Sequence, residues 1–289
     1  EKFSDVKLIQ NDVNVGLSAR NLGVKKSKGE YIVFLDSDTI VDNNWLNILH
    51  DSYKKNGVGL YQPKLIDKNN KNLINSAGNM INVFGLGFSR GKGKEDKGQY
   101  EKFQTISYTS GACTFSSSKI IKKIGKVDEI FFAYHDDLDY GWRGWLLQIP
   151  SYYEPKALVY HFGSPTLKWS GKKFFYLERN RWICLLTLYS TKTQIKILPL
   201  LVILEIGIFF YLLTKGYGRN KISSLISLIK LWRQIQKKKK RITKTRKDND
   251  KNIVKNFVSD FEIPLMVQDD ESQNIQRKCI MNLGNIAKS

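Results

Sequence analysis

The segment from Tyr31 to Thr39 constrains the fold of this chain more than any other part of the sequence. It begins with an apolar, β-type run that ends at Leu35, and two carboxylates, Asp36 and Asp38, follow at once. A buried strand that delivers acidic side chains at its carboxyl end places them where open α/β sheets bind ligands. Two hard oxygen donors at that place suit Mg²⁺ or Mn²⁺, which take one or two carboxylates together with substrate phosphates.

The same two carboxylates have a purely structural alternative. A strand followed by an Asx-type turn would use Asp36 or Asp38 to cap the helix expected to begin near Trp45. The local sequence is compatible with both interpretations, so the choice depends on the rest of the chain.

Residues 1 to about 165 alternate short apolar runs with amphipathic stretches, which is typical of βα units and of an α/β fold. The stretch from about 67 to 99 is rich in Gly, Asn and Lys and predicts a mobile substrate loop or a hairpin. The expected strands are 6–9, 31–35, 58–66 and 157–160, and the expected helices are 14–24, 45–49, 117–124, 135–147 and 172–189.

The charge of the chain restricts its partners. The 289 residues carry a net charge of +20, and the twelve Lys and Arg residues from Arg219 to Lys247 are accompanied by no acidic residue. An anionic partner is therefore expected: a membrane surface, nucleic acid or phosphorylated substrates. Nucleic acid is disfavoured because the basic stretch follows a strongly apolar one and no zinc, RNP or helix-turn-helix signature is present. Three widely spaced cysteines indicate reduced thiols in a cytosolic setting.

Residues 195–213 are the most apolar stretch, barely long enough to span a bilayer, and they include Pro199 and Glu205. Apolar residues at helical spacing then predict a basic amphipathic helix over 221–236 in a membrane interface, with residues 237–241 on anionic lipid. Basic residues flank the apolar stretch on both sides, so we expect a shallow insertion at the cytoplasmic face of the cell membrane. The alternative is an ordinary helix packed on the core.

Three carboxylates, Asp136, Asp137 and Asp139, crowd the start of a predicted helix, where the helix dipole favours anions. Asp139 can pair with Arg143 four positions later, and Asp136 can cap the helix. Asp137 has no evident local partner. A carboxylate that a helix end keeps ionised at the edge of a cleft is suited to act as a general base.

His161 ends a predicted strand, as Asp38 does, so the two side chains could meet at one edge of the sheet. A lone histidine is more often structural than a ligand. Beside Asp36 and Asp38, however, it could complete a metal site.

Taken in order, these sequence motifs resemble those of the family-2 glycosyltransferases. The resemblance implies a GT-A fold: a Rossmann-like, mixed and mostly parallel sheet flanked by helices, here followed by C-terminal membrane-associated helices. It also implies an inverting, hexosyltransferase-type enzyme with a nucleotide-sugar donor and Mg²⁺ or Mn²⁺ as cofactor. The matching motifs are Asn14-x-Gly16-x-x-x-Arg20-Asn21-x-Gly23, Gly29 to Thr39, Asp128 to Asp139, Pro155-x-Ala157-x-Val159-x-His161 and Glu178-Arg179-Asn180, within roughly residues 5–182.

The resemblance also implies roles for individual residues. Asp36 and Asp38 match the Asp-x-Asp pair that holds the metal and the donor diphosphate. Asp137 matches the catalytic base of the family's acidic pair, which reads Asp-Asp here and more commonly Glu-Asp. His161 matches a histidine that joins the metal in some members. The remaining donor-binding candidates are Asn14, Arg20 and Asn21, with Gly111, which lets the backbone approach a ligand or simply makes a turn.

The expected organisation is a glycosyltransferase domain over 1–190, apolar and basic membrane-associated helices over 191–247 and a polar tail over 248–289. Family members usually begin with a strand-helix-strand unit that holds the nucleotide base. That unit is not found before the Asn14 segment, so we expect the domain to be N-terminally incomplete by roughly fifty residues, judged from the usual βαβ length. The expected acceptor is a lipid-linked or cell-surface glycan, as in polysaccharide biosynthesis. A soluble glycosyltransferase and a non-catalytic sugar-nucleotide-binding or membrane-tethering remnant remain alternatives.

Overall fold

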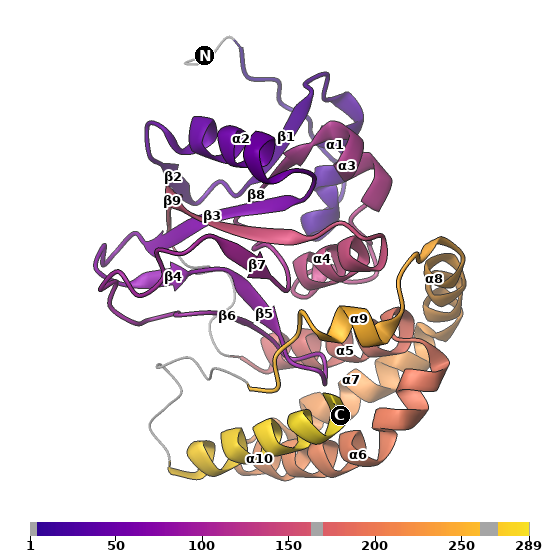
Figure 1. The fold of residues 1–289 in the computed structure, drawn as a ribbon. Helices are drawn as coiled ribbons and strands as arrows, with labels where there is room; N and C mark the ends of the chain where they lie inside the picture. The colour runs from indigo at the N-terminus through magenta and orange to yellow at the C-terminus, as the bar shows by residue number, and fades with distance from the viewer. Residues whose placement is uncertain (1–4, 163–169, 261–270, 289) are drawn as a thin grey trace.

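A computed structural model describes residues 5–162, 170–260 and 271–288 of the chain. At its centre is a mixed seven-stranded sheet (Figure 1), and a two-stranded hairpin lies below it. The main path of the sheet is β1 (Tyr31–Leu35), β8 (Cys113–Ser117), β3 (Leu60–Asp67), β9 (Ser151–His161) and β2 (Thr39–Val41), while β4 (Ile74–Ser76) pairs with β3 and β7 (Gln104–Ile106) pairs with β9.

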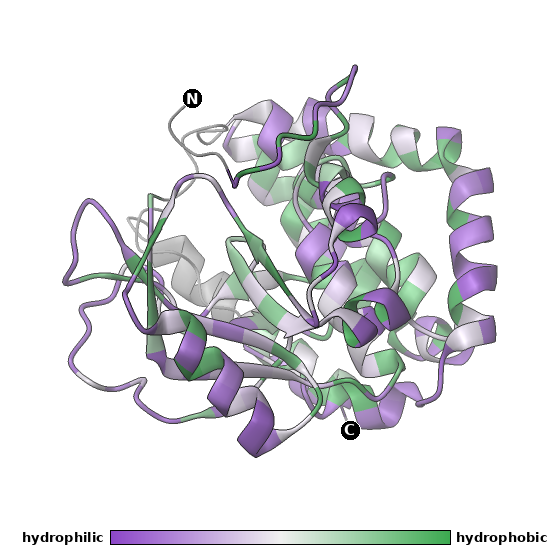
Figure 2. Ribbon diagram, turned by 90° about the horizontal axis from the view of Figure 1, so that it is seen from above, coloured by the Kyte–Doolittle hydropathy of each residue, from purple (hydrophilic) through white to green (hydrophobic). Residues whose placement is uncertain are grey.

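Successive apolar side chains of β1 point to opposite faces of the sheet, which explains why helices cover both faces. Ile32 and Phe34 point into one buried cluster, and Tyr31 and Val33 pack against another. Figure 2 shows hydrophobic residues along the strands and hydrophilic residues in many of the outer helices and loops. The first cluster is covered by α1 (Arg20–Lys26), α3 (Ser118–Ile124) and α4 (Asp136–Leu146), and the second by α2 (Trp45–Asn56).

The mixed sheet flanked by helices that the resemblance implies is confirmed. The expectation of mostly parallel pairing is wrong for the described strands, since β3 and β9 are the one parallel pair among them. Parallel neighbours require a crossover, usually through a helix. The chain between β3 and β8 contains no helix, and β8 returns antiparallel between β1 and β3.

Two expected segments have different outcomes in the structure. Residues 6–9 form no strand, and Val6 and Leu8 are 70% and 87% exposed. Alternating apolar and polar residues produce a strand only where the edge of another strand is available for pairing. The stretch after β3 forms β4 and a hairpin of β5 (Asn79–Ile81) and β6 (Gly87–Ser89), so the hairpin alternative is confirmed.

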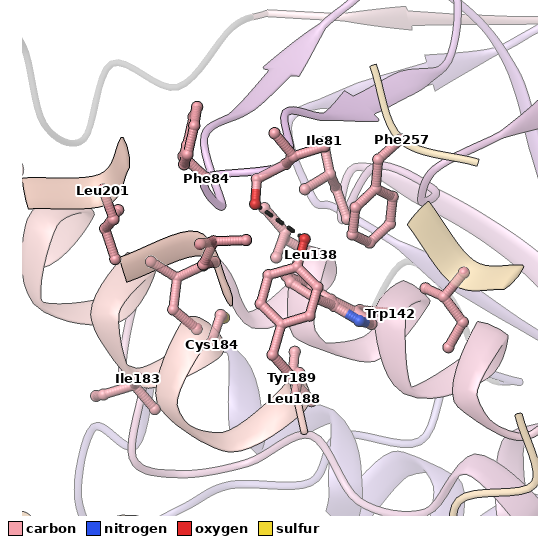
Figure 3. Close-up of a cluster of buried hydrophobic side chains, with 14 of the residues drawn as sticks. Ile81, Phe84, Leu138, Trp142, Ile183, Cys184, Leu188, Tyr189, Leu201 and Phe257 are labelled. Atoms are coloured by element: carbon pink, nitrogen blue, oxygen red, sulfur yellow. Dashed lines mark hydrogen bonds between the residues drawn. The ribbon is translucent and has the colours of Figure 1, made fainter. Parts of the chain in front are cut away.

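The hairpin contributes to the largest buried cluster of the protein (Figure 3). Ile81 and Phe84 meet Trp142 of α4 and Tyr189, whose hydroxyl donates to the carbonyl of Val83 at 2.9 Å. Trp142 is fully buried, so it belongs to the core. Other contributions come from the C-terminal helices, which are α5 (Gly171–Leu188), α6 (Thr191–Thr214), α7 (Gly218–Lys230), α8 (Trp232–Thr245), α9 (Asp250–Val254) and α10 (Glu271–Lys288).

The expected amphipathic helix over 221–236 is divided between α7 and α8, and α8 packs on the core through Ile235 and Ile242. Lys238 is buried and pairs with Asp128 at 2.9 Å and with Asp139 at 2.8 Å. The expectation that residues 237–241 lie on lipid is therefore wrong for Lys238. Asp139 is fully buried and Asp128 is largely shielded from solvent, so both carboxylates favour a cation beside them, and Lys238 thereby holds α8 against α4 and the segment before it.

Helix α6 is long and apolar enough to cross a membrane, and 22% of its most apolar window is buried. Glu205 points inward and pairs with Arg181 of α5 and with Lys221 of α7. The outward side, which we term the apolar face, consists of Ile195, Leu198, Val202, Ile203, Ile206, Phe210 and Leu213 of α6, Ile222, Leu225, Ile226 and Ile229 of α7, and Trp232.

The segment expected to be a polar tail also reaches the core. Ile253 and Phe257 are buried in the largest cluster, and the backbone N–H of Val258 donates to the carbonyl of Ile81 at 2.9 Å. Sparse apolar residues in a polar stretch are a weak sequence signal, but two well-placed side chains are enough to dock such a segment on a preformed surface.

Candidate active site

Three candidate metal ligands lie together at the carboxyl end of β1. Ligand atoms of Asp36, Asp38 and His161, hereafter the metal-binding group, all lie within 4.8 Å of one another. Asp36 and Asp38 follow β1 directly, and β2 pairs antiparallel with β9 so that Thr39 faces His161. The Nε2 atom of His161 is 3.5 Å from Oδ2 of Asp38. Two carboxylates and an imidazole fit a divalent cation such as Mn²⁺.

The capping alternative for the two carboxylates does not hold. Helix α2 begins at Trp45 with Asn44 as its N-cap, and no side chain caps it by a hydrogen bond. Asp36 and Asp38 therefore remain available as ligands at the sheet edge.

Asn75 on β4 orients His161, and the sequence analysis did not identify it. Its Oδ1 atom lies 3.1 Å from Nδ1 of His161. An amide oxygen only accepts hydrogen bonds, so Nδ1 is the donor in this contact and Nε2 faces Asp38. Metal-binding histidines usually donate their second ring N–H in this way. A single Asn in a polar stretch carries no sequence signal for this role.

Arg20 links the metal-binding group to the segment around Gly111. Its Nη2 atom donates to Asp36 and, at 2.9 Å, to the carbonyl of Gly111. A guanidinium in this position can also bind a phosphate oxygen. The structure thus places Arg20, Asp36 and Gly111 together.

The two remaining donor-binding candidates do not reach this group. Oδ1 of Asn14 accepts from the backbone N–H of Gly16 at 2.9 Å and closes the turn before a 3₁₀ helix, Gly16–Ala19. Asn21 hydrogen bonds in both directions to the backbone of Val127, at 2.9 Å each way. Both polar groups of Asn21 are engaged there, so this side chain anchors α1 instead of facing a donor.

Asp137, the candidate base, lies next to Gly111. Its Oδ2 atom accepts from the backbone N–H of Gly111 at 3.1 Å, and its Oδ1 atom accepts from its neighbour Leu138 at 2.8 Å. A Cβ atom at Gly111 would lie 3.5 Å from Arg20 and 3.7 Å from Asp137, so it would occupy the space between them. The backbone of Gly111 therefore connects the candidate base to Arg20, because its N–H donates to Asp137 and its C=O accepts from Arg20.

The two adjacent carboxyls have different environments. Asp136 is 4% exposed, and burial, with the neighbouring charge of Asp137, raises its pKa to about 8. Burial also raises the pKa of Asp137, but the N–H groups of Gly111 and Leu138 oppose the shift. Asp136 is therefore the member of the pair that holds a proton more strongly, and Asp137 is the member that ionises more readily.

Asp139 and Arg143 pair at 2.8 Å, as expected, and Arg143 also donates to backbone carbonyls. Asp136 is not the N-cap of α4: that position is taken by His135, in a left-handed conformation. The loop before α4, residues 131–135, holds three non-glycine residues at positive φ: Phe132 at 61°, Tyr134 at 63° and His135 at 62°. Such conformations cost on the order of 1–3 kcal/mol each and persist where surrounding structure imposes them.

The chain shows similarity to known glycosyltransferases. Residues 1–125 match the family described as Glycosyl transferase family 2. A pre-mycofactocin glycosyltransferase of Mycobacterium tuberculosis is 28% identical over 178 residues, which are 60% of this chain and 36% of that protein. A poly-beta-1,6-N-acetyl-D-glucosamine synthase of Staphylococcus epidermidis is 26% identical over 184 residues, which are 63% of this chain and 41% of that protein. The matched region thus spans well under half the length of these relatives.

A crystal structure of GalNAc-T7 with UDP, GalNAc and Mn²⁺ shares 15% sequence identity with this chain. The superposition covers 61% of this chain and 36% of that chain, with a TM-score of 0.47, below the level at which a shared fold can be argued.

Proposed function

We infer that the chain is a member of glycosyl transferase family 2, whose model matches residues 1–125, and that it transfers a sugar from a nucleotide-diphosphate donor to a hydroxyl group of a glycan or lipid-linked acceptor. We further propose that the transfer inverts the anomeric carbon and uses Mg²⁺ or Mn²⁺. The observation that supports the proposal best is the bridge at Gly111, which joins the candidate base Asp137 to Arg20 and hence to Asp36.

Each residue has a distinct part in this proposal. Asp36, Asp38 and His161 would hold the divalent cation, which neutralises the charge that develops on the leaving diphosphate. Arg20 would exchange its contact with Asp36 for a phosphate oxygen of the donor. Asp137 would take the proton from the acceptor hydroxyl while the hydroxyl oxygen attacks the anomeric carbon from the face opposite the leaving diphosphate. Attack from that face inverts the configuration of the anomeric carbon.

The test is a donor screen with the full chain. Release of nucleoside diphosphate from a panel of nucleotide sugars is measured with Mn²⁺, with Mg²⁺ and with a chelator. Release with one donor class that requires the cation supports the proposal. Cation-dependent donor binding without any release would favour the second candidate, a non-catalytic sugar-nucleotide-binding protein.

Asn75→Ala should lower the affinity for Mn²⁺ about 10- to 100-fold, because His161 loses the acceptor that fixes its ring. Titration with Mn²⁺, read from the electron paramagnetic resonance signal of the free ion, measures the effect without a donor. Asn70→Ala is the matched control, since the Asn70 side chain only closes a local turn with Asn72. Equal affinities in both variants would remove Asn75 from the site.

We propose that the apolar face binds the cytoplasmic surface of the cell membrane and brings the active site to a lipid-linked or cell-surface acceptor. The face is contributed by α6 and α7, which contact each other, and the inward ion pairs of Glu205 take up the one acidic side chain of these two helices. Basic side chains near it, such as Arg219 and Lys230, can contact anionic headgroups. A soluble enzyme would have to cover this face by other means.

Phe210→Ser combined with Ile229→Ser should weaken binding to phosphatidylglycerol-containing vesicles on the order of tenfold, because two side chains that are 62% and 75% exposed lose their apolar contact with lipid. Flotation of vesicles at two salt concentrations measures this. Binding should weaken but persist at high salt, since the apolar contribution is not screened. Val58→Ser, which removes an exposed apolar group elsewhere, is the control.

The two membrane models can be separated by proteolysis. If residues beyond Asp248 are protected in sealed vesicles that expose their cytoplasmic face, the chain crosses the membrane and the interfacial model is wrong.

A further inference from the structure

The 131–135 loop is held by a side chain that takes no part in the chemistry proposed above. Asn180 of α5 is fully buried, and its Nδ2 atom donates to three carbonyls of the loop. The distances are 3.1 Å to Phe131, 2.7 Å to Ala133 and 2.8 Å to Tyr134. One amide group thus binds the loop on both sides of Phe132, the first of its residues at positive φ.

Arg179 fixes the orientation of that amide. Its Nε atom donates to Oδ1 of Asn180 at 2.9 Å, so the Nδ2 group must face the loop. Its Nη2 atom donates to the carbonyls of Ile130 and Phe131 at 3.1 and 2.9 Å. The two neighbouring side chains therefore act as one clamp on the loop backbone.

The opposite side of the loop contacts the segment that leads to Arg20. The carbonyl of Phe132 accepts from the N–H of Leu17 at 3.4 Å, and a Cβ atom on Gly16 would lie 1.9 Å from this carbonyl oxygen. Gly16 itself has a φ of +63°. The loop is thus enclosed between α5 and the Gly16 turn, and a shift of the loop would displace the start of α4.

Helix α5 is a rigid support for the clamp. Glu178 and Arg181, which flank the clamp residues, form a buried ion-pair network with Glu205 of α6 and Lys221 of α7. Burial opposes ionisation of Glu178, but the charges of Arg181 and Lys221 prevail and lower its pKa to about 2. The network fixes α5 against the helices that carry the apolar face.

We propose that Asn180 and Arg179 are positioning residues, which hold the strained 131–135 loop so that the carboxylate of Asp137 stays against Gly111 and faces the metal-binding group. The inference rests on the proposed role of Asp137 as the base. It accounts for three left-handed residues within a five-residue loop beside a site, because the clamp supplies the hydrogen bonds that such a backbone cannot make by itself.

The test compares three variants of the full chain. Asn180→Ala removes all three bonds to the loop. Asn180→Asp has nearly the same shape and keeps the contact with Arg179, but it replaces the donor with a carboxylate that faces three carbonyls. Thr187→Val is the control, since it removes a buried hydrogen bond from the same helix, to Ile183, away from the loop.

Both Asn180 variants should lower kcat about 10- to 100-fold with little change in the donor KM, because a misplacement of about 1 Å costs this much. Their amide hydrogen exchange over 131–138 should accelerate at least about tenfold relative to Thr187→Val. Affinity for Mn²⁺ should be unchanged in all three. If Asn180→Asp keeps wild-type kcat and exchange, Asn180 supports α5 alone and the positioning role is wrong.

Failure of the proposed function gives a different result. If the wild-type chain transfers sugar from no donor while exchange over 131–138 still accelerates in the Asn180 variants, the clamp exists but holds no catalytic base. If transfer occurs and exchange accelerates but kcat is unchanged, the loop does not position the base.

Discussion

Asp38→Ala should reduce sugar transfer by on the order of a thousandfold or more, since a bound cation contributes several kcal/mol to stabilisation of the leaving charge. Cation-dependent donor binding should be lost with it. The side chain is 34% exposed at the sheet edge, so its removal leaves no core cavity and the fold should persist. Nucleoside diphosphate release, Mn²⁺ titration and thermal unfolding measure the three effects separately.

Asp42→Ala is the matched control for this experiment. Asp42 follows β2, close to Asp38 in the sequence, and its carboxylate accepts only from the N–H of Asn44, at 3.3 Å. Transfer, metal affinity and melting temperature should stay close to wild type. Near-normal transfer by Asp38→Ala, with its metal dependence unchanged, would show that the cation binds elsewhere.

Asp137→Asn should lower turnover by roughly a hundredfold or more, because general-base assistance is lost, while donor affinity is retained. The change is nearly isosteric, and an amide oxygen can still accept from Gly111 or from Leu138. Steady-state kcat and donor KM, measured with the donor identified by the screen, separate the two effects.

The pH dependence gives a second measurement of the same role. A base must be deprotonated to act, so wild-type kcat/KM should rise with pH through the pKa of Asp137, which burial raises above the usual carboxyl range. The rise should be absent in Asp137→Asn. A variant that keeps full turnover and only melts at lower temperature would assign Asp137 to stabilisation of α4, with the base elsewhere.

Several parts of the fold and the site could be predicted from local sequence. The five-residue strand before Asp36 and Asp38 appears as β1, and the short helix closed by Gly125 appears as α3. The i, i+4 pair of Asp139 and Arg143 forms as expected. Each of these depends on periodicity, on a glycine at positive φ or on a spacing within one helix, and neighbours in the sequence are sufficient to determine them.

Other parts depended on partners distant in the sequence. Residues 6–9 have the alternation of a strand but no edge to pair with, and Asn21 found its partner at Val127, more than a hundred positions away. Glu205 looked costly in an apolar helix until the fold brought Arg181 and Lys221 to it. None of these partners has a fixed offset that a sequence pattern could detect.

By itself, the sequence determined which chemical groups are available and at which strand ends and helix starts they occur. Only the tertiary structure decided that His161 meets Asp38, through the pairing of β2 with β9, and that Asn75 orients its ring. Only the structure, likewise, placed Asn180 under the 131–135 loop. The physical reason is that hydrogen bonds and ion pairs act over a few ångströms in space, whatever the separation along the chain, and packing of the core sets those distances.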